Sequence, residues 1–333
     1  MPELTTDKVR EFLGHLQGRT VTLTQLRGEF NIVRGAKSWD GIRNIMYQLA
    51  AGKERIIKPS GVKDGSYKVI KRAERVNVFG IKRERKLPVE FFFPRDFDTG
   101  MELPFADSVV LRQGDLILIA GFSNYGKTTL ALNMVAENID KNPVLMGNEF
   151  TDEAEQPRQR FLNRMDAMSE IQWTDDDGND RFELLPVHED FEDNIVKNKI
   201  NLIDWIDLEE EPWTIKDVEK RLKLAVGDGI VVAVVQKNET SETGYGGNPS
   251  KFYTDLELLV DKHTSTESRI TVGKVKESKG YISGRSWAYG IKGQGTQIYN
   301  VREVAKCHEC HGFKYVKGKG ACPSCLAVGW LDK

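Results

Sequence analysis

No apolar run in this sequence is long enough to span a membrane. The longest uninterrupted apolar stretches have the length of strands, whereas a transmembrane helix needs about 20 apolar residues. The first residues, MPELTTDKVREF, include acidic side chains and no apolar signal core, so no targeting peptide is expected. These absences argue against membrane and secreted proteins. The expected location is the cytoplasm, which includes a nucleoid-associated or viral-replication context.

An excess of charge of one sign is also lacking. The chain has 48 Lys and Arg residues against 50 Asp and Glu residues, a formal net charge of −2 at pH 7. This balance says little about nucleic acid, but the charge is unevenly distributed: residues 1–86 are basic and residues 151–219 are acidic. A nucleic-acid contact is therefore expected first at the basic end.

Cysteine is absent from most of the chain, and all four cysteines lie in the last 27 residues. They form two C-x-x-C pairs, Cys307 with Cys310 and Cys322 with Cys325, separated by eleven residues. Two such pairs bring four thiolates into a tetrahedron that suits a structural Zn²⁺. Two disulfides are the less expected use of this pattern in a cytosolic chain.

The histidines His308 and His311 could substitute as zinc ligands, although four cysteines already complete the shell. Glycines lie between the two cysteine pairs, and the tail resembles a zinc ribbon. Its lysines make it a candidate nucleic-acid contact, and docking to a protein partner is the alternative. A unit this small is expected to depend on the metal for its fold.

The strongest motif runs from Gly114 to Ile139, GDLILIAGFSNYGKTTLALNMVAENI. The apolar run 116–120 predicts a buried strand, and the residues after Lys127 have a helical pattern. Between them GFSNYGKT satisfies G-x-x-x-x-G-K-[ST], the P-loop, in the strand–loop–helix context that the motif requires. The sequence therefore predicts a nucleotide-binding site.

The P-loop residues have distinct expected roles. Glycines let successive backbone N–H groups point at phosphate oxygens, and the helix that follows presents its positive end to them. Lys127 would reach the β- and γ-phosphates, and the Thr128 hydroxyl would hold Mg²⁺. The expected contacts of ATP are Gly121, Asn124, Gly126, Lys127, Thr128 and Thr129.

Three further strand ends carry candidate catalytic residues. Glu149 follows the strand 143–147, at the sheet edge where open α/β sheets bind ligands, and it can act as general base. The segment KINLID ends in Asp204, the expected Mg²⁺ residue, with Asp207 as its rival. The apolar strand 229–236 ends in Gln236, which can sense hydrolysis. A surface glutamate and a capped strand end are the structural alternatives.

The basic end predicts three helices, at residues 5–17, 23–30 and from an N-cap at Ser38 onward. Two short strands around a turn follow the helices. This order resembles a winged helix, in which the third helix lies in the DNA major groove. The expected phosphate contacts are Lys37, Arg43 and Lys53. Contact with protein alone is the alternative.

The remaining segments are less informative. The basic stretch 71–86 is either a solvated linker or an arm that tracks phosphates, and the aromatics that follow it are expected to pack on the core or on a neighbouring subunit. A long amphipathic helix is expected over 152–168. The acidic stretch after Trp173 is expected to be a solvated loop.

Residues 105–295 resemble the RecA/DnaB-like P-loop ATPases, and the first block resembles replicative helicases in particular. The matching blocks are GDLILIAGFSNYGKTTLALN, VLMGNEF, NLIDWIDL, VVAVVQKN and ITVGKVKESKG. The resemblance implies an α/β fold with a twisted, mostly parallel sheet, and an ATPase that works between subunits of a ring or filament around single-stranded nucleic acid. It also implies that Glu149 is the catalytic base, that Asp204 holds Mg²⁺ and that Gln236 links to a DNA-binding loop at 238–251, which includes Lys251.

Two features depart from this family. Its trans-acting residues lie in a strand like ITVGKVKESKG, where this chain has Lys274 and Lys276, and Arg285 is the nearest arginine. A lysine lacks the forked, bidentate geometry of arginine. In addition, a winged helix replaces the helical N-terminal domain of bacterial replicative helicases.

The sequence thus predicts a winged-helix-like domain (1–70), a basic, proline-containing linker (71–104), a RecA-like ATPase domain (105–300) and a zinc ribbon (301–333). The function expected from this order is a helicase-like, oligomeric DNA motor of replication or recombination that hydrolyses ATP at subunit interfaces. The alternative is an ATP-switched regulator or loader that binds DNA and recruits partners without translocating. A small-molecule kinase would not need two flanking modules.

Overall fold

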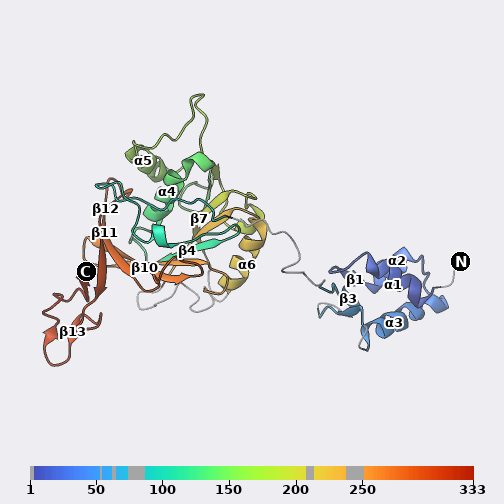
Figure 1. Cartoon of the computed structure of the whole chain (residues 1–333). Coiled ribbons are helices and arrows are strands. Elements are labelled where there is room, and N and C mark those ends of the chain that lie inside the picture. The colour runs from blue at the N-terminus through green and yellow to red at the C-terminus, as the bar shows by residue number, and fades with distance from the viewer. Residues whose placement is uncertain (1–3, 53–54, 62–64, 74–86, 208–213, 238–250) are drawn as a thin grey trace. The chain divides into compact units, whose positions relative to one another are not determined.

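The computed structural model describes residues 4–52, 55–61, 65–73, 87–207, 214–237 and 251–333 (Figure 1). The chain divides into two compact units, Met1–Glu84 and Arg85–Lys333. Among the described residues, no helix combines the length and apolar character needed to cross a membrane.

The first unit has three helices and a small antiparallel sheet of order β1-β3-β2. In chain order its elements are α1 (Thr6–Gly14), β1 (Thr20–Thr22), α2 (Leu23–Glu29), α3 (Lys37–Ala50), β2 (Ile57–Pro59) and β3 (Ser66–Val69). Leu13, Leu26, Ile42 and Met46 are fully buried between these elements. The three expected helices and the hairpin β2–β3 are present, and β1 is an additional strand, too short to give a periodic signal.

Helix boundaries in this unit follow local backbone chemistry. Thr22 caps α2 through a reciprocal capping box with Gln25, which satisfies amides that would otherwise lack partners. Helix α3 begins at Lys37 after Ala36, so Ser38 lies inside its first turn instead of serving as the expected N-cap. Lys37 and Arg43 are both exposed on α3. Lys53 lies outside the described residues.

The second unit is built on a ten-stranded sheet of order β15-β12-β11-β10-β9-β4-β8-β7-β5-β6 (Figure 1). All five pairings from β9 to β6 are parallel, and the four from β15 to β9 are antiparallel. The expected α/β fold with a mostly parallel sheet and a P-loop is therefore confirmed.

The elements of the second unit alternate between strand and helix only in its parallel half. They are η1 (Ala106–Ser108), β4 (Leu116–Gly121), α4 (Lys127–Glu137), η2 (Ile139–Lys141), β5 (Val144–Met146), α5 (Gln159–Ala167), β6 (Glu183–Leu185), η3 (Phe191–Asp193), β7 (Ile200–Ile206), α6 (Ile215–Ala225), β8 (Ile230–Gln236), β9 (Leu256–Lys262), β10 (Glu267–Val275), β11 (Ser286–Lys292), β12 (Gln297–Lys306), β13 (Tyr315–Val316), β14 (Gly320–Ala321) and β15 (Trp330–Asp332).

The central strands are apolar throughout because both faces of the sheet are covered. Every residue of β4 is buried, and alternate residues belong to different core clusters. Ile117 and Ile119 pack with Leu130 of α4, whereas Leu116 and Leu118 share a cluster with residues of α6. The sheet thus positions the P-loop from two separate cores.

Two predicted elements differ from those observed. Helix α5 begins at Gln159, not near residue 152, because Pro157 disfavours helix at the residue before it and Thr151 bridges to Pro157. Strand β7 continues through Asn201, whose side-chain amide donates to the Val196 carbonyl oxygen at 2.9 Å and accepts from the Val196 amide at 2.8 Å. A buried asparagine with these bonds does not interrupt the strand.

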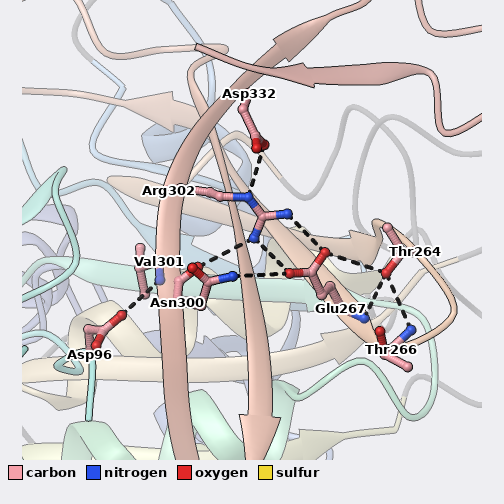
Figure 2. Close-up of polar contacts among 8 residues, drawn as sticks. All are labelled: Asp96, Thr264, Thr266, Glu267, Asn300, Val301, Arg302 and Asp332. Carbon is pink, nitrogen blue, oxygen red and sulfur yellow. Dashed lines mark hydrogen bonds and ion pairs between the residues drawn. The ribbon is translucent and has the colours of Figure 1, made fainter. Parts of the chain in front are cut away.

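The segment before the P-loop belongs to the core of the second unit. Phe93 and Phe105 are buried and stack edge to face, with ring centroids 5.2 Å apart. Asp96 accepts a 2.7 Å hydrogen bond from the amide of Val301 in β12, as Figure 2 shows. The expectation that these aromatics pack on the core or on a neighbour is met on the core side.

Strand β12 crosses the domain boundary expected at residue 300 and attaches the cysteine-containing tail to the sheet. It pairs with β11 on one side and β15 on the other. Figure 2 shows the guanidinium of Arg302 between Glu267 and Asp332. It donates to both Glu267 carboxylate oxygens, at 2.7 and 2.9 Å, and to Asp332 at 2.9 Å. This bidentate geometry joins β10, β12 and β15.

Candidate nucleotide and metal sites

The P-loop connects the end of β4 to the start of α4, as the motif predicts. Gly126 precedes the helix with φ of 90°, and a Cβ at this position would lie 2.4 Å from Cδ1 of Ile291. Both the left-handed backbone and the close contact require glycine. Asn124 also has a positive φ, 67°, which asparagine tolerates better than most residues.

The side chain of Lys127 folds back across the loop. Its Nζ donates to the carbonyl oxygen of Phe122 at 3.0 Å. Burial lowers the pKa of Lys127, and the charges of Asp204 and Glu149 oppose that shift. The structure therefore brings together Lys127 and the two carboxylates that were singled out from separate strand ends.

Asp204 lies in β7, with 1% of its surface exposed. Burial raises its pKa to about 6; the charge of Glu149 raises it further, whereas a hydrogen bond from the Thr128 hydroxyl lowers it. Its Oδ2 has no hydrogen-bond partner among the described residues. Asp207, the rival candidate, is exposed beyond the end of β7.

A buried carboxylate oxygen without a partner, next to a threonine hydroxyl, is the donor set of a hard cation such as Mg²⁺. Asp204 and Thr128 therefore fit the metal that accompanies ATP, and Asp207 does not meet this test. Gly147 contributes by its lack of a side chain, because a Cβ there would lie 2.1 Å from the carbonyl oxygen of Asp204. This close approach was not recognised from the sequence, although Gly147 stands in the block VLMGNEF.

Glu149 follows β5 and is half-buried. The residue before it, Asn148, has its Oδ1 2.7 Å from Nδ1 of His188. The other ring nitrogen of His188 is 3.5 Å from the Thr151 hydroxyl. His188 thus links both sides of the segment that carries Glu149. The sequence offered no signal for His188 beyond the scarcity of histidine.

Gln236 ends β8, the strand between β4 and β7. In the parallel register Gln236 pairs with Gly121, the first P-loop residue. The candidate sensor therefore lies level with the start of the phosphate-binding loop. The next residue, Lys237, is buried, and its Nζ is 2.5 Å from Oδ1 of Asp261 in β9.

The turn between β11 and β12 supports the P-loop helix. The Thr129 hydroxyl donates to the Gly295 carbonyl oxygen at 2.6 Å, and the Asn133 amide donates to the Thr296 carbonyl oxygen at 2.6 Å. The Thr129 side chain is thus already engaged, so its backbone amide is the group left for a phosphate.

The candidate trans-acting residues do not lie at the P-loop of their own chain. Lys276 is 2.8 Å from Oδ1 of Asp255, and the other oxygen of Asp255 accepts from the amide of Leu116, at the start of β4. This is the opposite edge of the sheet from the P-loop. Lys274 donates to the carbonyl oxygen of Lys251 nearby.

Arg285 contacts Glu303 through two hydrogen bonds, of 3.0 and 2.7 Å. These bonds raise the pKa of Arg285 and lower that of Glu303 to about 2. Arg285 is therefore engaged within its own chain. A trans role for Lys274, Lys276 or Arg285 remains a prediction about a neighbouring subunit.

The four cysteines form one buried cluster. All four sulfur atoms lie within 4.8 Å of one another, with Cys307 and Cys322 3.8 Å apart and Cys310 and Cys325 3.6 Å apart. Four thiolates at a Zn–S distance of about 2.3 Å have S···S separations of about 3.8 Å, whereas a disulfide needs about 2.05 Å. The cluster fits Zn²⁺. His308 and His311 are exposed, outside it.

We expect the purified chain to contain about one zinc ion, measured by elemental analysis. Cys310→Ser should lose the metal and loosen the tail, because so small a module depends on its metal for folding. His311→Ala is the matched control and should retain the metal. A native protein without zinc, or a Cys310→Ser variant with a full equivalent, would contradict the assignment.

No protein-family model and no curated protein matches this sequence. Among solved structures, the second unit is similar to a KaiC-like protein of the hyperthermophilic archaeon Pyrococcus horikoshii OT3, with 18% identity, a TM-score of 0.42 and coverage of 65% of this chain and 100% of that one. It is also similar to the ATPase domain of a DnaB-like helicase, with 13% identity, a TM-score of 0.41 and coverage of 57% and 85%. These likenesses are too distant to carry an argument. The strand order and the P-loop themselves place the core in the α/β P-loop class.

Proposed function

We propose that this chain is an ATPase that binds ATP at the P-loop and uses Glu149 as the general base for the attacking water. The observation that carries this proposal is the convergence of Lys127, Thr128, Asp204 and Glu149 at the carboxyl edge of the parallel strands. That edge is where open α/β sheets bind their ligands.

Each residue has a role that follows from its position. Lys127 neutralises charge on the transferred phosphoryl group, once its Nζ leaves the Phe122 carbonyl oxygen for a phosphate. Thr128 and Asp204 would hold Mg²⁺, which supplies further charge stabilisation when bound. Glu149 accepts the proton of the attacking water. Gln236, level with Gly121, is placed to respond to loss of the γ-phosphate.

The finer proposal is a helicase-like DNA motor of replication or recombination that acts as a homo-oligomer. Helix α3 of the first unit exposes Lys37, Arg43 and Tyr47, the last with 75% of its surface accessible. A positive helix face with an exposed aromatic suits a DNA groove. The Gly-rich loop after Gln236 lies outside the described residues from 238 to 250, and Lys251 at its end is described.

The second candidate is an ATP-switched regulator or loader that binds duplex DNA and does not translocate. The observation that favours it is the absence of a free arginine where a motor needs a trans-acting one: Lys274 and Lys276 stand there, and Arg285 is held by Glu303. Lysine provides charge but not a bidentate contact.

Steady-state ATP hydrolysis without nucleic acid, with single-stranded DNA and with duplex DNA separates these functions. We expect basal turnover, and stimulation of about tenfold or more by single strands, because a motor spends ATP only on its track. Stimulation by duplex alone, or none, would favour the regulator. A chain with no magnesium-dependent hydrolysis under any condition would overturn the ATPase proposal itself.

A further inference from the structure

The largest cleft in the described part of the second unit lies between the P-loop, the antiparallel part of the sheet and the cysteine-containing tail. Its volume is about 690 Å³. The floor consists of alternate residues of β9 and β10, among them Leu259, Asp261 and Thr271. One wall comes from the P-loop and the other from the tail. Neither wall is explained by the nucleotide site or by the zinc site alone.

The cleft is strongly positive. One lining carboxylate, Asp261, faces six basic lining residues: Lys237, Lys251, Lys262, Arg269, Lys306 and Lys314. Asp261 already binds both Lys237, at 2.5 Å, and Arg269, at 3.1 Å. Lys262 and Lys314 are exposed and are not compensated by it. This surplus favours a polyanion.

Aromatic side chains stand on both walls. Phe122 and Tyr125 of the P-loop line one side, with ring centroids 5.9 Å apart. Phe313, with 79% of its surface exposed, and Trp330 line the tail side. The guanidinium of Arg269 lies 3.8 Å above the centroid of the Trp330 ring. Exposed aromatics among basic side chains are the means by which proteins hold unpaired bases, which stack on them.

The tail wall is fixed to the core. Strand β15 pairs with β12, and the contacts of Arg302 with Glu267 and Asp332 join both strands to β10 (Figure 2). A further bond, from the Lys333 Nζ to Glu303, closes the end of the chain onto β12 at 2.9 Å. The distance between the two walls is therefore set by the fold of the zinc module.

We infer that this cleft binds single-stranded nucleic acid and that the zinc module is one wall of the binding site. A duplex has its bases stacked inward and offers no free ring to Phe313 or Trp330, so the unpaired strand is the occupant that matches both the charge and the aromatics. Because Phe122 and Tyr125 belong to the P-loop, a strand in the cleft contacts the loop that holds the nucleotide. This coupling rests on the proposed ATPase; the binding site does not.

The test is the affinity of the full-length, zinc-loaded chain for a fluorescent oligo-dT, measured by anisotropy at several salt concentrations. Phe313→Ala combined with Lys314→Ala should weaken binding about tenfold or more and reduce the salt dependence by about one phosphate contact. Stimulation of hydrolysis by single strands should fall in parallel, with basal hydrolysis unchanged.

Tyr315→Ala combined with Lys317→Ala is the matched control. Both residues are exposed on the same module and carry the same chemistry, but neither lines the cleft. Their affinity should stay within about threefold of the native value, and zinc content should be equal in both variants. Equal loss in both variants, or native affinity in the Phe313 and Lys314 variant, would overturn the inference. A change of oligomeric state without a change in DNA affinity would overturn it in favour of a second copy of the chain. Loss of basal hydrolysis in the native protein would count against the ATPase alone.

Discussion

Lys127→Ala is expected to lower kcat for ATP hydrolysis by about 100- to 1000-fold, the usual effect of removing a charge that stabilises the transition state. Lys127 is the cation that the P-loop directs toward the phosphates, and its Nζ now bonds only to the Phe122 carbonyl oxygen. A coupled assay of phosphate release at saturating ATP measures the change.

The fold should survive this substitution. Burial lowers the pKa of Lys127, so its charge is held at a cost to the apo protein. The thermal midpoint of Lys127→Ala should therefore equal or slightly exceed that of the native chain. Lys141→Ala is the control, because Lys141 pairs with Glu90 at 3.0 Å away from the P-loop and should leave kcat unchanged. Persistent turnover in Lys127→Ala would remove the P-loop from the mechanism.

Asp204→Asn is expected to have opposite effects on activity and stability. Activity should fall by about a hundredfold or more, because the carboxylate that would hold Mg²⁺ becomes neutral. Stability without metal should rise, since the native chain must keep a buried carboxylate ionised at neutral pH. Its pKa of about 6, against about 3.9 unfolded, corresponds to about 3 kcal/mol, or a rise in Tm on the order of 5–10 °C.

The pH dependence of this difference follows from the direction of the shift. Below about pH 4 Asp204 is protonated in both states, and the two proteins should have similar stability. As the pH rises from about 4 to 6, the unfolded state ionises first, so the native chain loses stability that Asp204→Asn keeps. Above about pH 6 the difference should be constant.

Thermal unfolding of both proteins from pH 4 to 8 without magnesium measures this dependence. Asp207→Asn is the matched control, because Asp207 is exposed at the end of the same strand and should change neither property. If Asp204→Asn is less stable than the native chain at pH 7, the buried carboxylate has a favourable partner and the cation-site assignment is wrong.

The expectations that held best depended on contiguous residues. The P-loop follows from one stretch of 26 residues, in which the strand, the loop and the helix are each specified by local pattern. The strands β7 and β8 also lie where the apolar runs predict them. Helix α5 was placed too early because the helical pattern ignored the effect of Pro157 on the residue before it.

The choice between Asp204 and Asp207 could not be made from the segment NLIDWID alone. Both are carboxylates at the end of one apolar run, and burial separates them: Asp204 is enclosed by β5, α4 and Gly147, whereas Asp207 is exposed. His188 was not found either, because its contacts with Asn148 and Thr151 join residues about 40 positions apart in a region without regular periodicity.

The sequence by itself determined the nucleotide loop and the four thiolates of the tail, because each depends on residue types at short, fixed spacings. The tertiary structure decided where these two features lie relative to one another. The tail extends the sheet through β12 and β15, and Arg302 fixes it there, so that the zinc module faces Phe122 and Tyr125 of the P-loop across a basic cleft. No local pattern encodes that proximity, because it arises from strand pairing between segments about 200 residues apart.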